Sequence, residues 1–412
     1  MWKMLKTNAD MRRVFLAQVI SYLGDWFSFV AIIGLIDDLT GSQFLISLVV
    51  VAFSLPSFLA SPIAGSMADR FDRRRILVIV SMVQAVSALG LLLVGKDTIW
   101  LAFLFQSTVS ALAAVVGPAT EAAIPNIARD EAELALANSL LGSTWGVMLA
   151  VGAAVGGVFA AVFGRDAAFI ANGISFLVSA ILFSRIRAPM QNERAQQTQR
   201  KRIRPIADMC EAIAHSRQDP VLMALIFSKT TFAIGAGVVS QLAVLASDVF
   251  NGGDSARGLL IGIRGVGTGL GPLIAMRYTR GQLSKVLTIC GFASLAFSGF
   301  YLVGAWMPTL WLTAIFVMLA HLGGGAQWTL SSYGLQLRSP DHIRGRILAG
   351  DFALVTLMLS LTSALAGLVA EYFGVRQAIS GFACAAAIAS VIYIRATQRL
   401  RTQLQLQPDA AL

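Results

Sequence analysis

Long apolar runs alternate with short polar segments along the whole chain. Each run holds about 20 residues with few charges, which is the length of a helix that crosses the hydrocarbon core of a bilayer. Because twelve such runs follow one another, the pattern predicts an all-α membrane protein with twelve transmembrane helices. The predicted spans are 14–36, 43–64, 76–95, 99–118, 139–163, 167–184, 221–247, 258–276, 286–306, 310–334, 347–370 and 377–394.

The composition supports this prediction. Hydrophobic residues make up 56% of the 412 residues, charged residues only 13%, and the mean hydropathy is +0.72. Soluble domains carry about 25% charged residues, so most of this surface must face lipid. The three cysteines (Cys210, Cys290 and Cys384) lie far apart and form no C-x-x-C pair. We therefore expect neither a metal site nor a disulfide framework.

Basic residues are divided unequally between the two sides of the predicted membrane. With the N-terminus in the cytoplasm, the outer loops hold only Lys96, Arg165, Arg257 and Arg376, two more lie inside spans, and cytoplasmic segments hold the other 26 of the 32. The positive-inside rule thus places both termini and the basic segment 185–217 in the cytoplasm. Such loops attract anionic membrane lipid, which accounts for the net charge of +10 without a nucleic-acid partner.

The chain also repeats itself once. Residues 157–164 (GVFAAVFG) match residues 367–374 (GLVAEYFG), and Pro62 matches Pro272 at the same offset of 210. Two six-helix halves therefore follow each other in the same orientation. Repeated halves of this kind form one class of transporter, in which the substrate site lies between the halves near the membrane midplane.

The repeat and the basic segment predict three regions. An N-terminal six-helix half covers 1–184, a cytoplasmic basic linker covers 185–217, and a C-terminal six-helix half covers 218–412. Within the linker, the polar composition predicts a flexible segment at 191–205 and a short surface helix at 206–215.

A family motif lies between the second and third spans. The stretch Gly65-Ser-Met-Ala-Asp69-Arg70-Phe-Asp72-Arg73-Arg74-Arg75 resembles the G-x-x-x-D-R-x-G-R-R signature of the major facilitator superfamily, with Asp72 where glycine is usual. The resemblance implies a cytoplasmic latch formed by Gly65, Asp69, Arg70, Arg73 and Arg74. In this latch Asp69 accepts hydrogen bonds from a helix N-terminus, and the arginines hold the loop at the lipid headgroups.

Further stretches resemble the drug-exporter branch of that superfamily, which includes macrolide, multidrug and enterobactin exporters. They are Gly24-Asp25, Asp38 to Ser42, Gly117 to Pro125, Ala137-Asn138-Ser139 and Arg344-Gly345-Arg346. The resemblance implies proton-coupled export of amphipathic small molecules by a monomer in the bacterial inner membrane. Two departures weaken the implied proton antiport. Span 5 reads Gly152-Ala-Ala-Val-Gly-Gly157 without the usual proline, and span 4 lacks an intramembrane arginine.

Asp25 is the leading candidate for proton binding. It lies midway along span 1 beside Tyr22 and Trp26, which are assigned to the substrate cavity, and the resemblance places span 1 along that central cavity. An apolar setting disfavours the charged form of a carboxyl group, which suits a proton-dependent switch. The alternative role for Asp25 is a structural ion pair with Lys229 or Arg264.

The other ionisable residues in the spans are assigned to the cavity or to a gate. Lys229 and His321 are candidate cavity residues; Lys229 is expected to pair with Asp25 or an anionic substrate, and the alternative for His321 is an ordinary hydrogen-bonded role. Arg264 is also assigned to the cavity, but it lies near the outer end of predicted span 8, so its side chain could instead extend to the interface. Glu121 and Asp351 are assigned to the cytoplasmic gate, together with Arg344 and Arg346.

Two alternative functions stay open. One is a transporter of a siderophore or of lysophospholipids, and the other is a membrane receptor or scaffold without flux. Charge buried at Asp25 favours transport, because a scaffold gains nothing from it. The sequence contains no paired catalytic carboxylates, nucleophile elbow or Walker A motif, so we expect no enzymatic activity and no cofactor. The expected partners are a small-molecule substrate, protons and membrane lipid.

Overall fold

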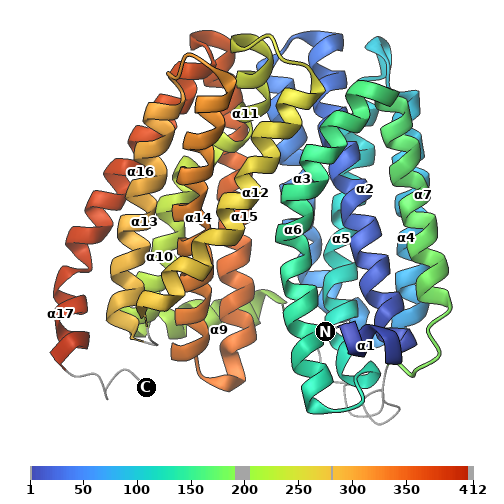
Figure 1. Cartoon of the computed structure of the whole chain (residues 1–412). Helices are drawn as coiled ribbons and strands as arrows, with labels where there is room; N and C mark the ends of the chain where they lie inside the picture. The colour runs from blue at the N-terminus through green and yellow to red at the C-terminus, as the bar shows by residue number, and fades with distance from the viewer. Residues whose placement is uncertain (1, 191–204, 280–281, 407–412) are drawn as a thin grey trace. The chain divides into compact units, whose positions relative to one another are not determined.

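The computed structural model describes residues 2–190, 205–279 and 282–406. Within these ranges there is no β-strand, and twelve helical segments are long and apolar enough to cross a membrane. The prediction of an all-α membrane protein with twelve spans is therefore confirmed (Figure 1).

Most spans are single helices. Span 3 continues from α4 into a 3-10 turn (Leu91–Leu93), and span 7 passes from α10 through a 3-10 segment (Ala236–Val239) and α11 to a π-helical end (Leu245–Val249). A short helix, α9, confirms the predicted surface helix at 206–215. The helices are α1 (Trp2–Thr7), α2 (Ala9–Thr40), α3 (Gln43–Arg70), α4 (Arg73–Gly90), α5 (Trp100–Ile127), α6 (Glu131–Phe163), α7 (Arg165–Ser184), α9 (Pro205–Gln218), α10 (Pro220–Gly235), α11 (Gln241–Val244), α12 (Asp254–Thr279), α13 (Leu283–Gly304), α14 (Leu310–Arg338), α15 (Asp341–Phe373), α16 (Val375–Ala396) and α17 (Gln398–Leu406).

Several helices begin earlier than their apolar runs, because polar residues cap them outside the hydrocarbon region. The side chain of Asn8 accepts a hydrogen bond from the Met11 backbone N–H, so α2 begins at Ala9 although the predicted span began at 14. Asp130 caps α6 in the same way, so α6 begins at Glu131, eight residues before the predicted span at 139. The helices are therefore longer than the apolar runs, and the apolar runs still mark the part of each helix that lies in the hydrocarbon region.

The described residues form two compact units. Unit 1 comprises Met1–Gly41, Ala52–Ile203 and Gly253–Gly262. In it α2 packs against α6 and α7, and α4 packs against α7. Buried side chains such as Leu77 and Phe183 close its core near the N-terminus.

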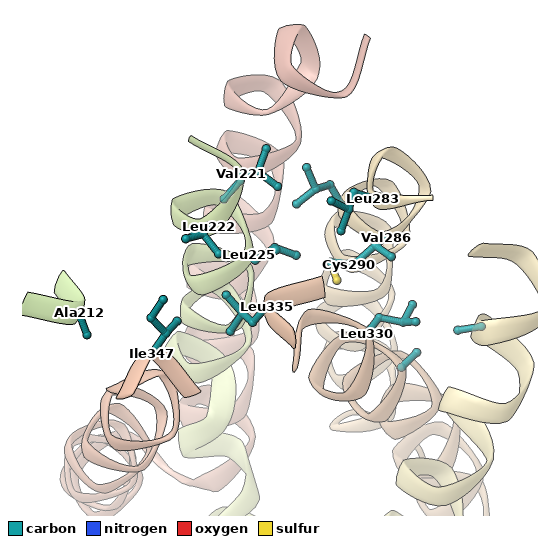
Figure 2. Close-up of a cluster of buried hydrophobic side chains, with 14 of the residues drawn as sticks. Ala212, Val221, Leu222, Leu225, Leu283, Val286, Cys290, Leu330, Leu335 and Ile347 are labelled. Atoms are coloured by element: carbon teal, nitrogen blue, oxygen red, sulfur yellow. The ribbon is translucent and has the colours of Figure 1, made fainter. Parts of the chain in front are cut away.

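Unit 2 comprises Ser42–Val51, Arg204–Gly252 and Ile263–Leu412. Here α13 packs against α14 and α16, and α10 packs against α14, α15 and α16. One buried cluster joins Val221 and Leu225 of α10 to Val286 of α13 and Leu330 of α14 (Figure 2). Ala212 belongs to the same cluster, so α9 is anchored to this core (Figure 2).

Two helices belong to both units. The first residues of α3 lie in unit 2 and the rest in unit 1, whereas the first residues of α12 lie in unit 1 and the rest in unit 2. The division of the chain into the halves 1–184 and 218–412 stays a prediction.

The internal repeat is visible in helix bounds and in backbone angles. Helices α6 and α15 each have 33 residues, and both ends differ by 210 in residue number. Each helix stops at a glycine with positive φ, Gly164 at 86° and Gly374 at 92°. The matched GVFAAVFG and GLVAEYFG segments therefore make the same helix end.

Candidate functional site

Asp25 lies at the centre of α2, sixteen residues after Ala9 and fifteen before Thr40. Its side chain is half-buried and accepts a hydrogen bond from the side chain of Asn172 on α7. Asn172 is 2% exposed and also accepts a hydrogen bond from the Ser175 hydroxyl over 3.1 Å. Within unit 1, no described lysine or arginine forms an ion pair with Asp25. Its carboxyl group is thus held by neutral polar groups.

Gly24 lets α7 approach α2 beside Asp25. A Cβ atom at Gly24 would lie 2.6 Å from Asn172 Oδ1 and 2.8 Å from Ser175 Cβ, distances that real Cβ atoms do not show. Glycine at this position therefore brings Asn172 within reach of the carboxyl group.

An aromatic and glycine-rich wall lies on the other side of Asp25. Trp26 is buried, and its ring centroid is 5.4 Å from that of Phe29 and 6.2 Å from that of Phe53. On α6, a Cβ at Gly152 would lie 3.0 Å from the Trp26 Cβ, and a Cβ at Gly156 would lie 2.9 Å from the Phe27 Cα. The span 5 motif, although it lacks proline, thus supplies glycines that pack α6 closely against α2.

Two further predicted residues of unit 1 are Tyr22 and Glu121. Tyr22 is half-buried and interacts electrostatically with both Asp25 and Glu121. Glu121 on α5 is exposed, and within unit 1 it has no described ion-pair partner. Three residues that the sequence assigned to different roles therefore share one part of unit 1.

In unit 2, Lys229 and Asp351 form a buried ion pair. Their side chains are 3% and 2% exposed. The Lys229 ammonium group also donates a hydrogen bond to the Ser332 hydroxyl over 2.7 Å and lies 5.1 Å from the centre of the Trp328 ring. The sequence interpretation sought a partner for Lys229 in Asp25 or in an anionic substrate; the structure pairs it with Asp351, which had been assigned to the gate.

Arg264 is the second basic residue that the sequence assigned to the cavity. Helix α12 begins at Asp254, so Arg264 lies ten residues, or about 15 Å, along it. The guanidinium group is half-buried and makes no hydrogen bond or ion pair with any residue in the described part of the chain, although it interacts electrostatically with Tyr301 and His321.

His321, the third predicted cavity residue of unit 2, is buried. It is 4% exposed, its Nε2 lies 2.8 Å from the Tyr301 hydroxyl, and its Nδ1 lies 3.4 Å from the Thr268 hydroxyl. Gly267 allows the close contact, because a Cβ there would lie 2.9 Å from the His321 Cβ. Both ring nitrogens thus face hydroxyl groups, as an interior hydrogen-bonded histidine requires.

The predicted latch is described only in part. The side chains of Gly65, Asp69 and Arg70 lie outside the described residues. Arg73 donates hydrogen bonds to the Ala122 and Met190 carbonyls over 2.7 and 2.9 Å. The sequence interpretation placed this arginine at the lipid headgroups, whereas the structure also shows it bonded to the backbone that follows α7.

The other arginines that the sequence assigned to the latch or the gate also contact protein groups. In unit 1, Arg74 of the latch donates a hydrogen bond to the Ala188 carbonyl over 3.0 Å. In unit 2, Arg344 donates to the Ser339 carbonyl over 3.0 Å, and Arg346 pairs with Glu211 of α9 over 2.5 Å. The latter pair ties α15 to the linker helix.

Sequence reasoning missed an ion cluster at the far end of unit 1. Arg257 is 4% exposed and pairs with Asp37 and with Asp254, the latter over 2.7 Å. Arg165 pairs with Asp38 over 2.6 Å and with Asp254 over 2.9 Å. The available signal was that only four basic residues lie on the predicted outer side, and two of them are in this cluster.

Comparisons with known proteins agree with this architecture. A family model described as "Transmembrane secretion effector" matches residues 3–411. The bacilysin exporter BacE of Bacillus subtilis is 25% identical over 89% of this chain and 90% of its own length. The multidrug efflux pump Tap of Mycobacterium bovis is 25% identical over 96% of this chain and 95% of its own length. The staphyloferrin A transporter of Staphylococcus aureus is 22% identical over 95% of this chain and 97% of its own length.

Solved structures show the same fold. A bacterial homologue of the human lysosomal transporter Spinster, in an inward-facing and occupied conformation, superposes with a TM-score of 0.75 at 15% identity, covering 94% of this chain and 96% of that chain. The nucleoside transporter NupG gives a TM-score of 0.70 at 14% identity, with coverages of 94% and 98%. With the family model matching nearly its whole length, the chain belongs to the transmembrane secretion effector family of the major facilitator superfamily.

Proposed function

We propose that this transporter is a secondary active exporter of amphipathic small molecules, driven by the proton gradient across the bacterial inner membrane. Its family and its relatives named as exporters support export. Asp25 carries the proposal for coupling, because it is a carboxyl group at the centre of a span whose described partners in unit 1 are neutral.

The proposed mechanism rests on the cost of a charge in an apolar setting. An ionised carboxyl group at this depth is unfavourable unless water or a cation compensates it. Proton binding at Asp25 removes that cost, so the protonated and ionised forms prefer different conformations. Asn172 positions the carboxyl group in both forms, because an amide can donate to a carboxylate and can accept from a carboxylic acid.

Transport by purified protein in proteoliposomes tests the coupling. Amphipathic dyes such as ethidium serve as probes, and one that the wild type concentrates under an imposed pH gradient is used for the variants. Asp25→Asn imitates the protonated form, so we expect it to lose gradient-driven accumulation while it retains exchange without a gradient. Asp97→Asn makes the same chemical change at an exposed residue between spans and should transport normally.

Two outcomes would count against this role. Full gradient-driven transport by Asp25→Asn would remove Asp25 from the coupling mechanism. A large fall in thermal stability together with loss of exchange would indicate that Asp25 is a structural residue, because the buried Asn172 would lose the carboxylate that accepts its hydrogen bond.

A second candidate concerns the cargo, which could carry a negative charge as a siderophore or a lysophospholipid does. Arg264 favours this candidate, because its guanidinium group has no described ion-pair partner. Its side chain is half-buried and lies about 15 Å along α12 from Asp254. An anionic group of the cargo would compensate this charge.

Transport of an anionic dye, compared with transport of a cationic dye, tests this candidate. With an anionic cargo site, Arg264→Gln should lower transport of the anionic dye fluorescein at least tenfold and change ethidium transport little. Arg277→Gln removes an exposed arginine from the same helix and should affect neither dye. An equal loss of both dyes in Arg264→Gln would contradict selective recognition of a negative charge.

A further inference from the structure

Four arginines meet in a pocket at the end of unit 1 that carries the N-terminus. Arg13 comes from α2, Arg74 from the first turn of α4, and Arg185 and Arg187 from the segment that follows α7. Ser184 and Ile186 complete the lining of this pocket, which has a volume of about 640 Å³. Two helices and the segment after α7 thus bring four positive charges to one place.

The floor of this arginine pocket is fixed by hydrogen bonds. Asp10 accepts from the backbone N–H groups of Arg187 and Ala188 over 3.1 and 2.9 Å. From the other side, Arg74 donates to the Ala188 carbonyl over 3.0 Å. Ile186 is 1% exposed and inserts into the core of unit 1. The pocket is therefore a built feature of the fold.

The charges of the pocket are compensated only in part. Asp10 is paired with Arg13 over 2.5 Å. The Nε of Arg74 is buried without a hydrogen-bond partner among the described residues. Arg185 and Arg187 are exposed, and their guanidinium groups have no partner in the described ranges. Four positive charges thus face one described carboxylate.

Apolar surface borders the pocket on the side of the spans. Leu16 is 38% exposed and lies three residues after Arg13 on α2, and Ile181 is 50% exposed and lies four residues before Arg185. Residues at these spacings share a helix face, so each apolar side chain lies one turn from an arginine toward the hydrocarbon region. A ligand that fits both surfaces has an anionic group attached to an apolar chain.

We propose that the arginine pocket binds the phosphate group of an anionic phospholipid, whose acyl chains lie along Leu16 and Ile181. Basic pockets at the ends of membrane helices suit lipid phosphates, since arginine forms paired hydrogen bonds with phosphate oxygens. A bound lipid would join α2 and α4 to the start of the linker. Inorganic phosphate shares the headgroup chemistry but lacks the apolar part, so it should bind much more weakly.

Native mass spectrometry of the full chain in detergent tests this site with phosphatidylglycerol as the probe. Each basic residue near a membrane contributes about a factor of five in affinity, so Arg185→Gln with Arg187→Gln should weaken binding roughly twenty-five-fold. The single variant Arg187→Gln should weaken it about fivefold. Both arginines are exposed, so neither change should alter the thermal midpoint without lipid.

A matched control removes two arginines from another basic pocket. Arg395→Gln with Arg399→Gln changes the pocket between α16 and α17, which a single stretch of chain forms. We expect this variant to bind phosphatidylglycerol within about threefold of the wild type, since the assigned site is intact.

Three results would overturn the proposal. Equal weakening in the control variant would mean that lipid follows the total surface charge. Equal affinity for phosphatidylcholine would mean that the anionic charge is not recognised. Inorganic phosphate binding as tightly as phosphatidylglycerol would make the pocket a site for soluble phosphate.

Discussion

At the scale of single residues, Lys229 and Asp351 keep two opposite charges inside the apolar part of unit 2. Removing each charge from water costs several kcal/mol, which their attraction and the hydrogen bond to Ser332 must offset. The Asp351 Oδ1 is buried without a hydrogen-bond partner among the described residues, so no second described group would stabilise the carboxylate if Lys229 were lost. The pair should therefore tolerate the loss of both charges better than the loss of one.

This asymmetry gives the first prediction. Lys229→Met leaves Asp351 as an unpaired buried charge and should lower the free energy of unfolding by about 3–5 kcal/mol. The double variant Lys229→Met with Asp351→Leu should recover most of that loss. Thermal unfolding in detergent, followed by tryptophan fluorescence, measures both.

Arg346 and Glu211 provide the control, because their side chains are 39% and 61% exposed. An exposed pair contributes about 0–1 kcal/mol, so Arg346→Gln should change stability little. If the double variant at 229 and 351 were as unstable as Lys229→Met, the pair would be stabilising in itself and this account of it would be wrong.

At the scale of helices, three glycines with positive φ end helices in two different ways. Gly41 ends α2 at φ 61°, ψ 6°, in the left-handed helical region. Gly164 and Gly374 end α6 and α15 near φ 90° and ψ 160°, a region that is almost restricted to glycine. Asparagine tolerates the first conformation but not the second.

The second prediction follows from these angles. Gly164→Asn or Gly374→Asn should lower the free energy of unfolding by about 1–3 kcal/mol, because both positions are strained for any side chain. Gly41→Asn should change it by only a few tenths, and no described atom lies within 4 Å of its Cβ position. Urea or thermal unfolding of the three variants in one detergent allows direct comparison, and equal effects at all three would refute the explanation.

The sequence predicted the helices well because apolar length is a local property. It did not predict the partner of Lys229, because pairing depends on depth and on helix face. Asp351 lies only four residues inside the predicted span 11, which favoured a gate role, and it is the packing of α15 against α10 that brings it to Lys229. The Asp37 and Asp38 ion pairs join segments more than 100 residues apart, and one sequence carries no distance signal for them.

At the scale of the whole molecule, the positive-inside rule makes the third prediction. Both termini and the linker should be cytoplasmic. In a chain without Cys210, Cys290 and Cys384, a membrane-impermeant maleimide should label Lys96→Cys in intact cells. It should label Arg200→Cys only after the membrane is permeabilised. Labelling of position 200 from outside would reverse the topology and with it the proposed direction of export.

The first residues of α3 belong to unit 2 and the first residues of α12 belong to unit 1, which limits how the gene for this chain can be divided. A polypeptide that ends at residue 190 lacks Asp254 and Arg257, which pair with Arg165 and Asp37 in unit 1. One that begins at residue 205 lacks Ser47, whose hydroxyl accepts a hydrogen bond from the buried Gln241 over 2.8 Å. Two genes encoding 1–190 and 205–412 should therefore yield degraded products when expressed separately and a transport-competent protein when expressed in the same cell, as immunoblots and dye transport would show. The gene could then be split in evolution only if both pieces were retained in the same genome. Recombination with a diverged relative would have to preserve the residues through which each piece contacts the other.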